Sequence, residues 1–515
     1  MVDEPNRPNS TLPRALLSRN PLAWLTLFGP GAIVASLTIG TGELIFSSRG
    51  GAIFGYRILL LFVVICVLKW CLVFSTARHM VLSGAHPFQR WMELPAGPRG
   101  WLPSLLFFFA AICIPVWVSF HAGVLGNLMA SVTGTRGQLG GGVDQLWGGL
   151  ILSGMLVLAL TGGYRALERV QLAIVLLLLL AVIAALILMR PDWWELARGA
   201  ILPQSLHYPA WLLNDARPEY RAIVARPVWV ETTLYVGVIG GASYDYLAYT
   251  SFLRDKRWGQ AGQGIAPPDV LQAIAEDPRH PVRRWVRAVL FDCTLSFVVV
   301  LVFTAVFVAL GALVLGPRQQ IPGNQNFLEH QAQFVTQLHP WLYPLYVAGA
   351  LLTMLGTLYG TLEVAPTVLR EMMRSVWSQV DPTVERRWRR LAIAWCGVGA
   401  LAILTASFLQ RVGGEAGRFP GMIAILTPAN LFTGVLSCGL ICLLNPWVDV
   451  HFLPRSLRMP ARLVLLNLLA GSVFVALGLK GYWDYGRWRA LGILVLTIGA
   501  GFLAAAATRL YRRGR

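Results

Sequence analysis

The chain has 515 residues, of which 56% are hydrophobic and only 13% are charged, and its mean hydropathy is +0.59. Soluble domains carry about 25% charged residues, so this composition excludes a soluble globular protein and is typical of an integral membrane protein. The formal net charge of +18 comes mainly from Arg residues in short segments between apolar runs. That distribution indicates membrane topology and contact with anionic lipids rather than binding to nucleic acid.

Apolar runs long enough to cross a bilayer follow one another along nearly the whole chain, since a crossing helix takes roughly 20 residues. Such runs exclude a transmembrane β-barrel, whose strands alternate apolar and polar residues. The sequence therefore predicts an all-α integral membrane protein with about twelve transmembrane helices. We place them at about residues 22–46, 52–77, 102–128, 145–161, 166–189, 228–252, 286–315, 341–366, 389–409, 421–445, 461–480 and 488–509.

The distribution of basic residues predicts how the chain is oriented. Residues 1–20 are polar and are expected to form a cytoplasmic tail, because the apolar run that follows is too long for a cleaved signal peptide. Residues 21–515 are expected to form a single transmembrane domain. With the N-terminus inside, the inner loops hold twice as many Lys and Arg residues as the outer loops. The positive-inside rule then puts both termini in the cytoplasm, and we expect the plasma (inner) membrane as the location.

Residue types that support enzymatic or disulfide chemistry lack the necessary patterns. The seven Cys residues lie in or beside apolar runs without metal-ligand spacing, so we expect packed core residues and no disulfide framework. The sequence contains no His-Glu-x-x-His, no Gly-x-Ser-x-Gly and no phosphate loop. We therefore predict that the protein is not an enzyme and carries no cofactor.

The first span contains a glycine-rich interruption beside a carboxylate. Gly40, Thr41 and Gly42 place poor helix formers directly before Glu43 at membrane depth. Acids inside a membrane usually face a cavity or a partner, and an unwound stretch exposes carbonyls that are good cation ligands. We therefore expect a helix break here. The alternative is a glycine-rich packing face from which Glu43 extends outward toward Arg49.

The sixth span has a similar interruption. Gly240 and Gly241 are followed by Ala242, Ser243 and, two residues later, Asp245. Transporters built from inverted repeats break the corresponding helix of each half, and here the first and sixth helices of a five-plus-five set are affected. The pattern predicts a substrate site near the midplane, although Asp245 taken alone fits a local helix cap equally well. The repeats are expected at about 22–189 and 228–445, with extra helices at about 461–509.

Three further polar residues are candidates for a proton route or an inner pathway. Asp292 lies near the cytoplasmic end of the seventh span and Glu363 near that of the eighth. Each is also explained by a headgroup-level ion pair with a nearby Arg. His121 in the third span has the right chemistry for a proton shuttle, but a lone His among Ser, Gly and Asn is more often a hydrogen-bonded packing residue.

Several motifs together resemble those of the Nramp divalent-metal transporter family. The family's first-span pattern runs GPG, an Asp-Pro-Gly-Asn break, then GA-x-FGY, and its spacing is matched here without a gap. The matching segments are Gly29-Pro-Gly31 with Ile33, Gly51-Ala52 with Phe54-Gly-Tyr56, Gly163-Tyr-Arg165-Ala-Leu-Glu168, Phe291-Asp-Cys-Thr-Leu-Ser and Gly356-Thr357-x-x-Gly360. The resemblance implies a LeuT-like inverted-repeat fold with extra C-terminal helices, and cation transport by alternating access.

The departures from this family pattern fall on the site itself. Where the broken first helix of family members supplies an Asp and an Asn, this chain has Gly40 and Glu43. The family's sixth-span run is Ala-x-x-Met-Pro-His-Asn, whose Ala carbonyl and Met sulfur bind the metal. One register puts Asp245 at the Met position and Ala242 at the carbonyl; the other puts Ser243 at Met and Asp245 at His. Both registers keep Asp245 in the break, and neither keeps the sulfur.

A site of carboxylates and carbonyls without sulfur suits the hard cations Mg²⁺, Mn²⁺ or Ca²⁺ better than softer transition metals. Asn430 in the tenth span, where the family places a polar ligand, is a further candidate, although a helix-end cap after Pro428 explains it as well. In the family, acids in the third span help to move protons. The third span of this chain contains no acid, so the resemblance does not predict proton coupling by that route. The metal ligands expected are Glu43, Asp245, Gly40, Thr41, Ala242, Ser243 and Asn430.

These observations favour a secondary transporter of a divalent metal cation, in which the metal is substrate rather than cofactor and proton symport is possible. A second hypothesis is a carrier of an organic solute or amine on the same fold, with Glu43 or Asp245 pairing an ammonium group. A third is a non-transporting sensor that kept the fold and lost the metal site. A membrane-embedded enzyme is a weaker fourth hypothesis.

Overall fold

A computed structural model describes most of the 515 residues. The residues that it does not describe are 1–12, 19, 32–34, 36–37, 96, 162–176, 178, 324–326, 377–380, 414–421 and 514–515. The described residues form helices and connecting turns, with no strand among them.

The chain begins with short helices, and long helices joined by connecting segments follow. The helices of the first half are α1 (Arg14–Leu17), α2 (Pro21–Trp24), α4 (Thr41–Phe54), α5 (Leu59–Ser83), α6 (Pro87–Trp91), α7 (Trp101–Val132), α8 (Val143–Thr161), α10 (Trp193–Ile201), α11 (Ala210–Leu213), α12 (Pro218–Val224), α13 (Val228–Val238) and α14 (Ser243–Asp255). Those of the second half are α15 (Pro268–Glu276), α16 (Pro281–Leu310), α17 (Phe327–Thr336), α18 (Tyr343–Val376), α19 (Pro382–Val412), α20 (Met422–Asn430), α21 (Ser437–Phe452) and α22 (Ala461–Arg513). There are also two π-helical segments. The first, η4 (Gly311–Leu315), continues α16, and the second, η6 (Leu431–Leu436), lies between α20 and α21.

Eight of the described helical stretches are long and apolar enough to cross a membrane, and a ninth qualifies if α12 and the stretch 228–255, which meet at 93°, form one span. The predicted number, twelve, is larger for physical reasons. The stretch 41–83 continues from the first predicted helix into the second, and α22 contains the last two, separated by non-helical backbone at Gly486 and Arg487. The fifth predicted helix lies largely outside the described residues, apart from a short apolar helix at Leu179–Leu188.

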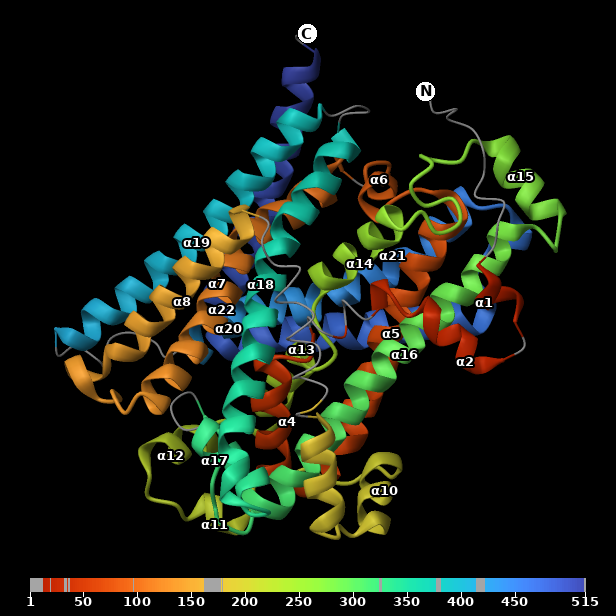
Figure 1. Cartoon of the computed structure of the whole chain (residues 1–515). Coiled ribbons are helices and arrows are strands. Elements are labelled where there is room, and N and C mark those ends of the chain that lie inside the picture. The colour runs from red at the N-terminus through yellow and green to blue at the C-terminus, as the bar shows by residue number, and fades with distance from the viewer. Residues whose placement is uncertain are drawn as a thin grey trace.

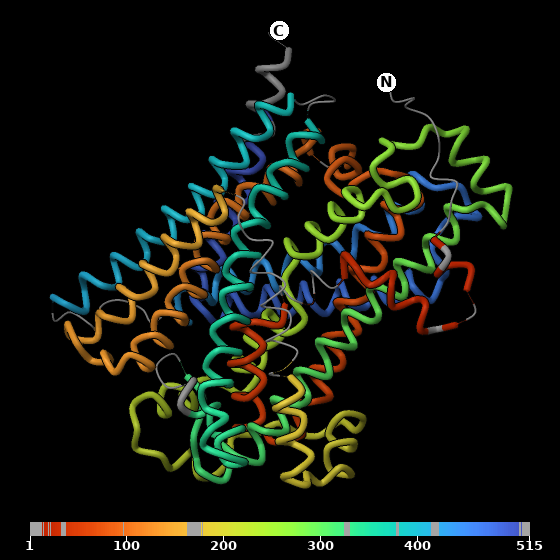
Figure 2. Tube along the Cα trace, in the orientation of Figure 1, coloured from red at the N-terminus to blue at the C-terminus, as the bar shows by residue number. Residues whose placement is uncertain are grey.

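Figure 1 shows two groups of long helices with broken helices between them. In one group α7, α8 and α19 pack against one another, and in the other α5 packs against α16. The tube in Figure 2 shows α13 and α14 passing between these groups, beside α4 and α18. Buried apolar side chains from all these helices contribute to one large core.

The connections gather at the two ends of the molecule. The helices α10, α11 and α12, from the predicted outer loop, lie with α17 at the lower end in Figure 1. The helix α15, from the predicted inner loop 253–284, lies at the opposite end, toward which the C-terminal part of α22 points. This separation is what the predicted topology requires.

All seven Cys residues are buried and free.

Both predicted breaks are present. The last helical residue before Gly40 is Thr38, and α4 begins at Thr41, with a hydrogen bond from Leu44 N to Gly40 O. In the sixth span α13 ends at Val238 and α14 begins at Ser243. Between them Gly240 and Gly241 have φ angles of 83° and 94°. Only glycine adopts such values without strain, so these two residues make the interruption possible.

Candidate functional site

Glu43 connects the two breaks. Its side chain lies in the first turn of α4 and is fully buried. One carboxylate oxygen, Oε1, accepts a hydrogen bond from the backbone N–H of Gly240 at 2.8 Å. The other, Oε2, accepts from the hydroxyls of Thr304 at 2.8 Å and Ser47 at 3.2 Å. Three donors therefore surround this buried carboxylate, and the first break is tied to the sixth through the backbone of Gly240.

Gly40 lies against the eighth span. A Cβ atom added at Gly40 would lie 1.7 Å from Thr357 Oγ1 and 2.7 Å from Thr357 Cβ, so only glycine fits. Thr357 belongs to the Gly-Thr-x-x-Gly motif of α18, which was recognised in the sequence without any indication of its partner. Gly40 is the position at which the family pattern has an Asp, and the space that such a side chain would need is filled by Thr357.

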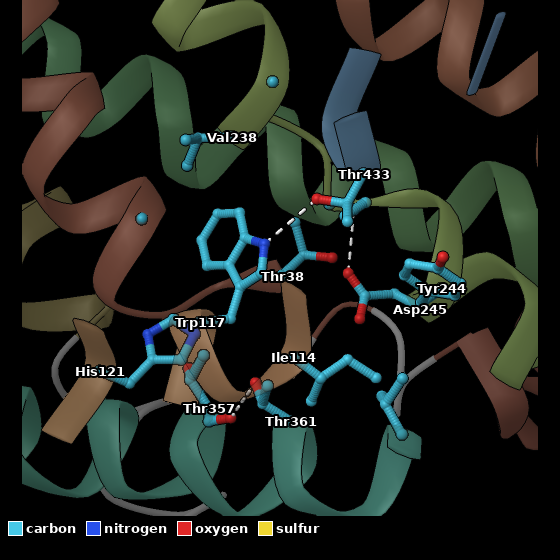
Figure 3. Close-up of a pocket in the computed structure, with 15 residues that line it drawn as sticks. Thr38, Ile114, Trp117, His121, Val238, Tyr244, Asp245, Thr357, Thr361 and Thr433 are labelled. Carbon is cyan, nitrogen blue, oxygen red and sulfur yellow. Dashed lines mark hydrogen bonds between the residues drawn. The ribbon is translucent and has the colours of Figure 1, made fainter. Parts of the chain in front are cut away.

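A cavity opens beside the two breaks and is the candidate substrate site. Its volume is about 70 Å³, and one water needs roughly 10–15 Å³ on this measure, so several waters or a partly hydrated ion fit. Figure 3 shows its lining, to which both breaks and the helices α7, α18 and η6 contribute. The polar and aromatic side chains of the lining are Thr38, Trp117, His121, Tyr244, Asp245, Thr357, Thr361 and Thr433.

Asp245 is the only carboxylate among the described lining residues. Its Oδ2 accepts a hydrogen bond from the backbone N–H of Ala242 at 2.9 Å, which caps the start of α14. No hydrogen bond to its Oδ1 is found among the described residues. Asp245 thus caps the helix with one oxygen, as the local alternative predicted, and contributes a carboxylate to the cavity as well.

His121 and Thr38 also line the cavity and have unused polar atoms. His121 is only 4% exposed, its ring stacks on Trp117, and its Nδ1 has no hydrogen-bond partner in the described part of the chain. Thr38 is 8% exposed, and its Oγ1 likewise has none there. Trp117 is held in place by a hydrogen bond from its Nε1 to Thr433 Oγ1 at 3.1 Å (Figure 3).

The remaining predicted ligands lie around the cavity rather than in its lining, apart from Ala242. The carbonyl of Ala242 accepts the N–H groups of Asp245 and Tyr246. Ser243 shares a hydrogen bond of 2.6 Å with Ser437. Asn430 donates from Nδ2 to the carbonyl of Leu234, and both its Oδ1 and the hydroxyl of Thr41 are buried without a partner among the described residues. No group of three or more His, Cys, Asp or Glu side chains that would suit a metal is found in the described residues.

Asp292 and Glu363 are positioned by specific partners away from the cavity. Asp292 accepts hydrogen bonds from the backbone N–H groups of Gly29 and Gly31, at 3.0 and 2.7 Å, and from Tyr249. It thereby joins two motifs that the sequence analysis noted separately. Glu363 pairs with Arg389 of α19, which is the kind of ion pair given above as its alternative explanation.

Sequence reasoning missed one charged residue close to the site. Lys69 of α5 is fully buried, and its ammonium group donates to carbonyls of the sixth-span break. A lysine in the middle of an apolar run was the available signal, but it was used only for topology. Trp117 and the threonines of the lining gave no comparable signal, because such residues are common in membrane helices.

The sequence comparison identifies a family whose profile matches most of the chain and a relative that matches about a third of it. The profile of the family described as "Natural resistance-associated macrophage protein-like", Nramp, matches residues 31–413. A divalent metal cation transporter, MntH, from Latilactobacillus sakei subsp. sakei is 25% identical over 193 residues. That alignment covers 36% of this chain and 39% of the relative. The motif Gly163 to Glu168 lies inside the matched range but outside the described residues.

The structural comparison concerns the fold. A crystal structure of a mutant of the Eremococcus coleocola manganese transporter superposes with a TM-score of 0.64 and 15% identity over 98% of this chain and 97% of that one. A structure of MhsT in complex with L-phenylalanine gives a TM-score of 0.51 and 16% identity over 88% and 98%. These likenesses confirm the predicted all-helical, LeuT-like membrane fold.

Proposed function

The chain belongs to the Nramp family, and from this membership we propose that it is a secondary transporter that moves a hard divalent cation, Mg²⁺ or Mn²⁺, across the membrane by alternating access. Family membership supports transport rather than enzymatic chemistry. Two of its relatives are named as a divalent metal cation transporter and a manganese transporter.

The chemistry of the cavity carries the proposal for a hard cation. Among the described residues, the polar groups of its lining are one carboxylate, four threonine hydroxyls, one imidazole, the Tyr244 hydroxyl, the Trp117 indole and backbone, and no lining side chain carries sulfur. Mg²⁺ keeps several of its waters and is commonly held by one or two carboxylates, so a single carboxylate in a cavity with room for water suits it. Asp245 would contact the ion or its waters through Oδ1, and the threonine hydroxyls would hold the remaining waters.

The position of the cavity supports alternating access. It lies where the first and sixth helices are interrupted, and interrupted helices at the interface of two repeats are a common place for substrate in transporters of this architecture. The hydrogen bond from Gly240 N to Glu43 links the two interrupted helices across this interface. For proton coupling the candidate group is His121, a titratable side chain of the cavity lining.

A small organic ammonium is the second candidate substrate, because the lining includes two aromatic side chains. Trp117 and Tyr244 stand in the same cavity as Asp245 (Figure 3). An ammonium group is stabilised by one carboxylate together with an aromatic face. The absence of a group of three metal-binding side chains among the described residues favours this candidate.

The test is uptake into liposomes that contain the purified protein, with Mg²⁺ or Mn²⁺ outside and with or without a proton gradient. The variant Asp245→Asn should lose most of the metal uptake, at least about tenfold, since one lost charge contact of about 1.4 kcal/mol already corresponds to a factor of ten. The matched control is Asp255→Asn, which changes an exposed carboxylate at the other end of α14 and should leave uptake unchanged.

The outcomes separate the candidates. Metal uptake that depends on Asp245, and is accelerated by an inward proton gradient, would support a metal–proton symporter; dependence on Asp245 without that acceleration would support an uncoupled metal carrier. If folded wild-type protein moves neither ion but its tryptophan fluorescence responds to small amines, the metal proposal is wrong and the amine carrier replaces it.

A further inference from the structure

Lys69 occupies a cradle of backbone carbonyls in the sixth-span break. Its Nζ lies 2.6 Å from the carbonyl oxygen of Gly241, 2.7 Å from that of Ile239 and 3.4 Å from that of Gly237. The side chain is fully buried on α5. In the described part of the chain no ion pair joins Lys69 to Glu43 or Asp245, so its direct partners are carbonyls rather than carboxylates.

The cradle exists because α13 ends inside the protein. The last carbonyls of a helix have no partner within the helix and carry its partial negative charge. In a membrane protein such groups must be satisfied internally or by a bound ion. Three carbonyls that point at one position form a cation site, and an ammonium group offers three donors to such a site.

The other carbonyls of the break already have partners within the chain. That of Val238 accepts from Gly241 N, that of Gly240 from the hydroxyl of Tyr246, and that of Ala242 from Asp245 N. The carbonyls that point at Lys69 are therefore those left over when the break has satisfied itself. Without the ammonium group they would face one another with no donor.

We propose that the carbonyls of Gly237, Ile239 and Gly241 form a monovalent-cation site that Lys69 fills permanently, so that the break keeps its shape without a dissolved ion. Lys69 is then a positioning residue: it does not touch the substrate but holds α13 and α14 in the geometry that presents Asp245 to the cavity. Its removal should create a protein that depends on a small monovalent cation.

The inference goes beyond the proposed function and is tested without transport. Thermal unfolding of detergent-purified Lys69→Met is measured in LiCl, NaCl, KCl and choline chloride at equal ionic strength. Met keeps the length of the side chain and removes the charge. The melting temperature of the wild type should be the same in all four salts. That of Lys69→Met should be lowest in choline and rise saturably with one of the small cations, by about 1–2 °C at ten times the dissociation constant for a chain of this length.

The matched control is Lys256→Met, at the C-terminal end of α14, where the lysine is exposed; it should behave as the wild type in every salt. Lys69→Gln keeps amide donors for the carbonyls without a charge, and serves as a second variant with a milder expected loss. Reconstituted Lys69→Met should also recover uptake only with the stabilising cation present, whereas Asp245→Asn should lose uptake with an unchanged melting temperature.

Melting temperatures of both Lys69 variants that do not differ among the four salts would overturn the inference and leave Lys69 as a hydrogen-bonding cap that no dissolved ion replaces. Failure of both variants to fold in every salt would overturn it for the same reason. Neither result bears on whether the wild type transports a metal, so this inference and the proposed function fail separately.

Discussion

The two helix breaks that flank the cavity differ in how far their polar groups are satisfied by hydrogen bonds within the protein. In the sixth span, carbonyls of the break are satisfied by Lys69, by Tyr246 and by the break's own backbone. In the first span, the hydroxyls of Thr38 and Thr41 are buried without a partner among the described residues. The sixth break is thus closed by the protein, and the first retains unused polar groups. Of these groups Thr38 and Asp245 line the cavity, and we propose that they are the open ligands that a substrate would meet.

The largest expected effect comes from adding a side chain at Gly40, where the first break lies against Thr357. Gly40→Ala places a Cβ 1.7 Å from Thr357 Oγ1, and overpacking of this kind costs about 1–3 kcal/mol and sometimes more. We expect a lower melting temperature and loss of uptake. Removing the obstructing side chain as well, in Gly40→Ala with Thr357→Gly, should restore part of the stability lost, beyond the sum of the single changes. Additive effects of the two changes would contradict the contact.

An intermediate effect is expected where the two breaks are tied together. Glu43→Leu removes the acceptor of Gly240 N–H, and a buried donor left without a partner costs about 1–3 kcal/mol. Glu43→Gln can still accept from Gly240 N–H while its amide group donates to the hydroxyls of Thr304 and Ser47. We therefore expect Glu43→Gln to be the more stable of the two in thermal unfolding.

Uptake by Glu43→Gln distinguishes a structural link between the breaks from a metal ligand. If Glu43 acts only as a link between the breaks, this variant should retain more uptake than Asp245→Asn. An equal loss in both variants would instead support the prediction that both carboxylates are metal ligands.

The smallest effect is expected on the far wall of the cavity. Thr433→Val is close in size but removes the acceptor of Trp117 Nε1, a hydrogen bond worth about 0.5–1.5 kcal/mol. The freed indole should raise the KM for uptake a few-fold with little change in melting temperature. Thr427→Val, on α20 outside the lining, is the control; equal kinetic effects of both changes would argue against a role for Trp117 in the cavity.

The parts of this architecture that depend on local composition were predictable. Long apolar runs determined the positions of most helices, and paired glycines next to acids located both breaks, because glycine lowers the cost of leaving the helix. The paired breaks were expected to share one site, but the contacts between individual distant residues were not predictable. Asp292 is 261 residues from Gly31, whose N–H it accepts, and Lys69 is 170 residues from Ile239. Each of these residues stood out in the sequence, but nothing local to it identified its partner.

The contact between Gly40 and Thr357 also constrains how the first break can change by mutation. Any side chain at position 40, a carboxylate included, collides with Thr357 at its first carbon atom. The family pattern nevertheless combines an acid at this position with the threonine of its Gly-Thr-x-x-Gly motif, so the two residue types do not exclude each other. What differs must be the spacing between the first and eighth helices, and in this chain a carboxylate at position 40 requires that spacing to widen.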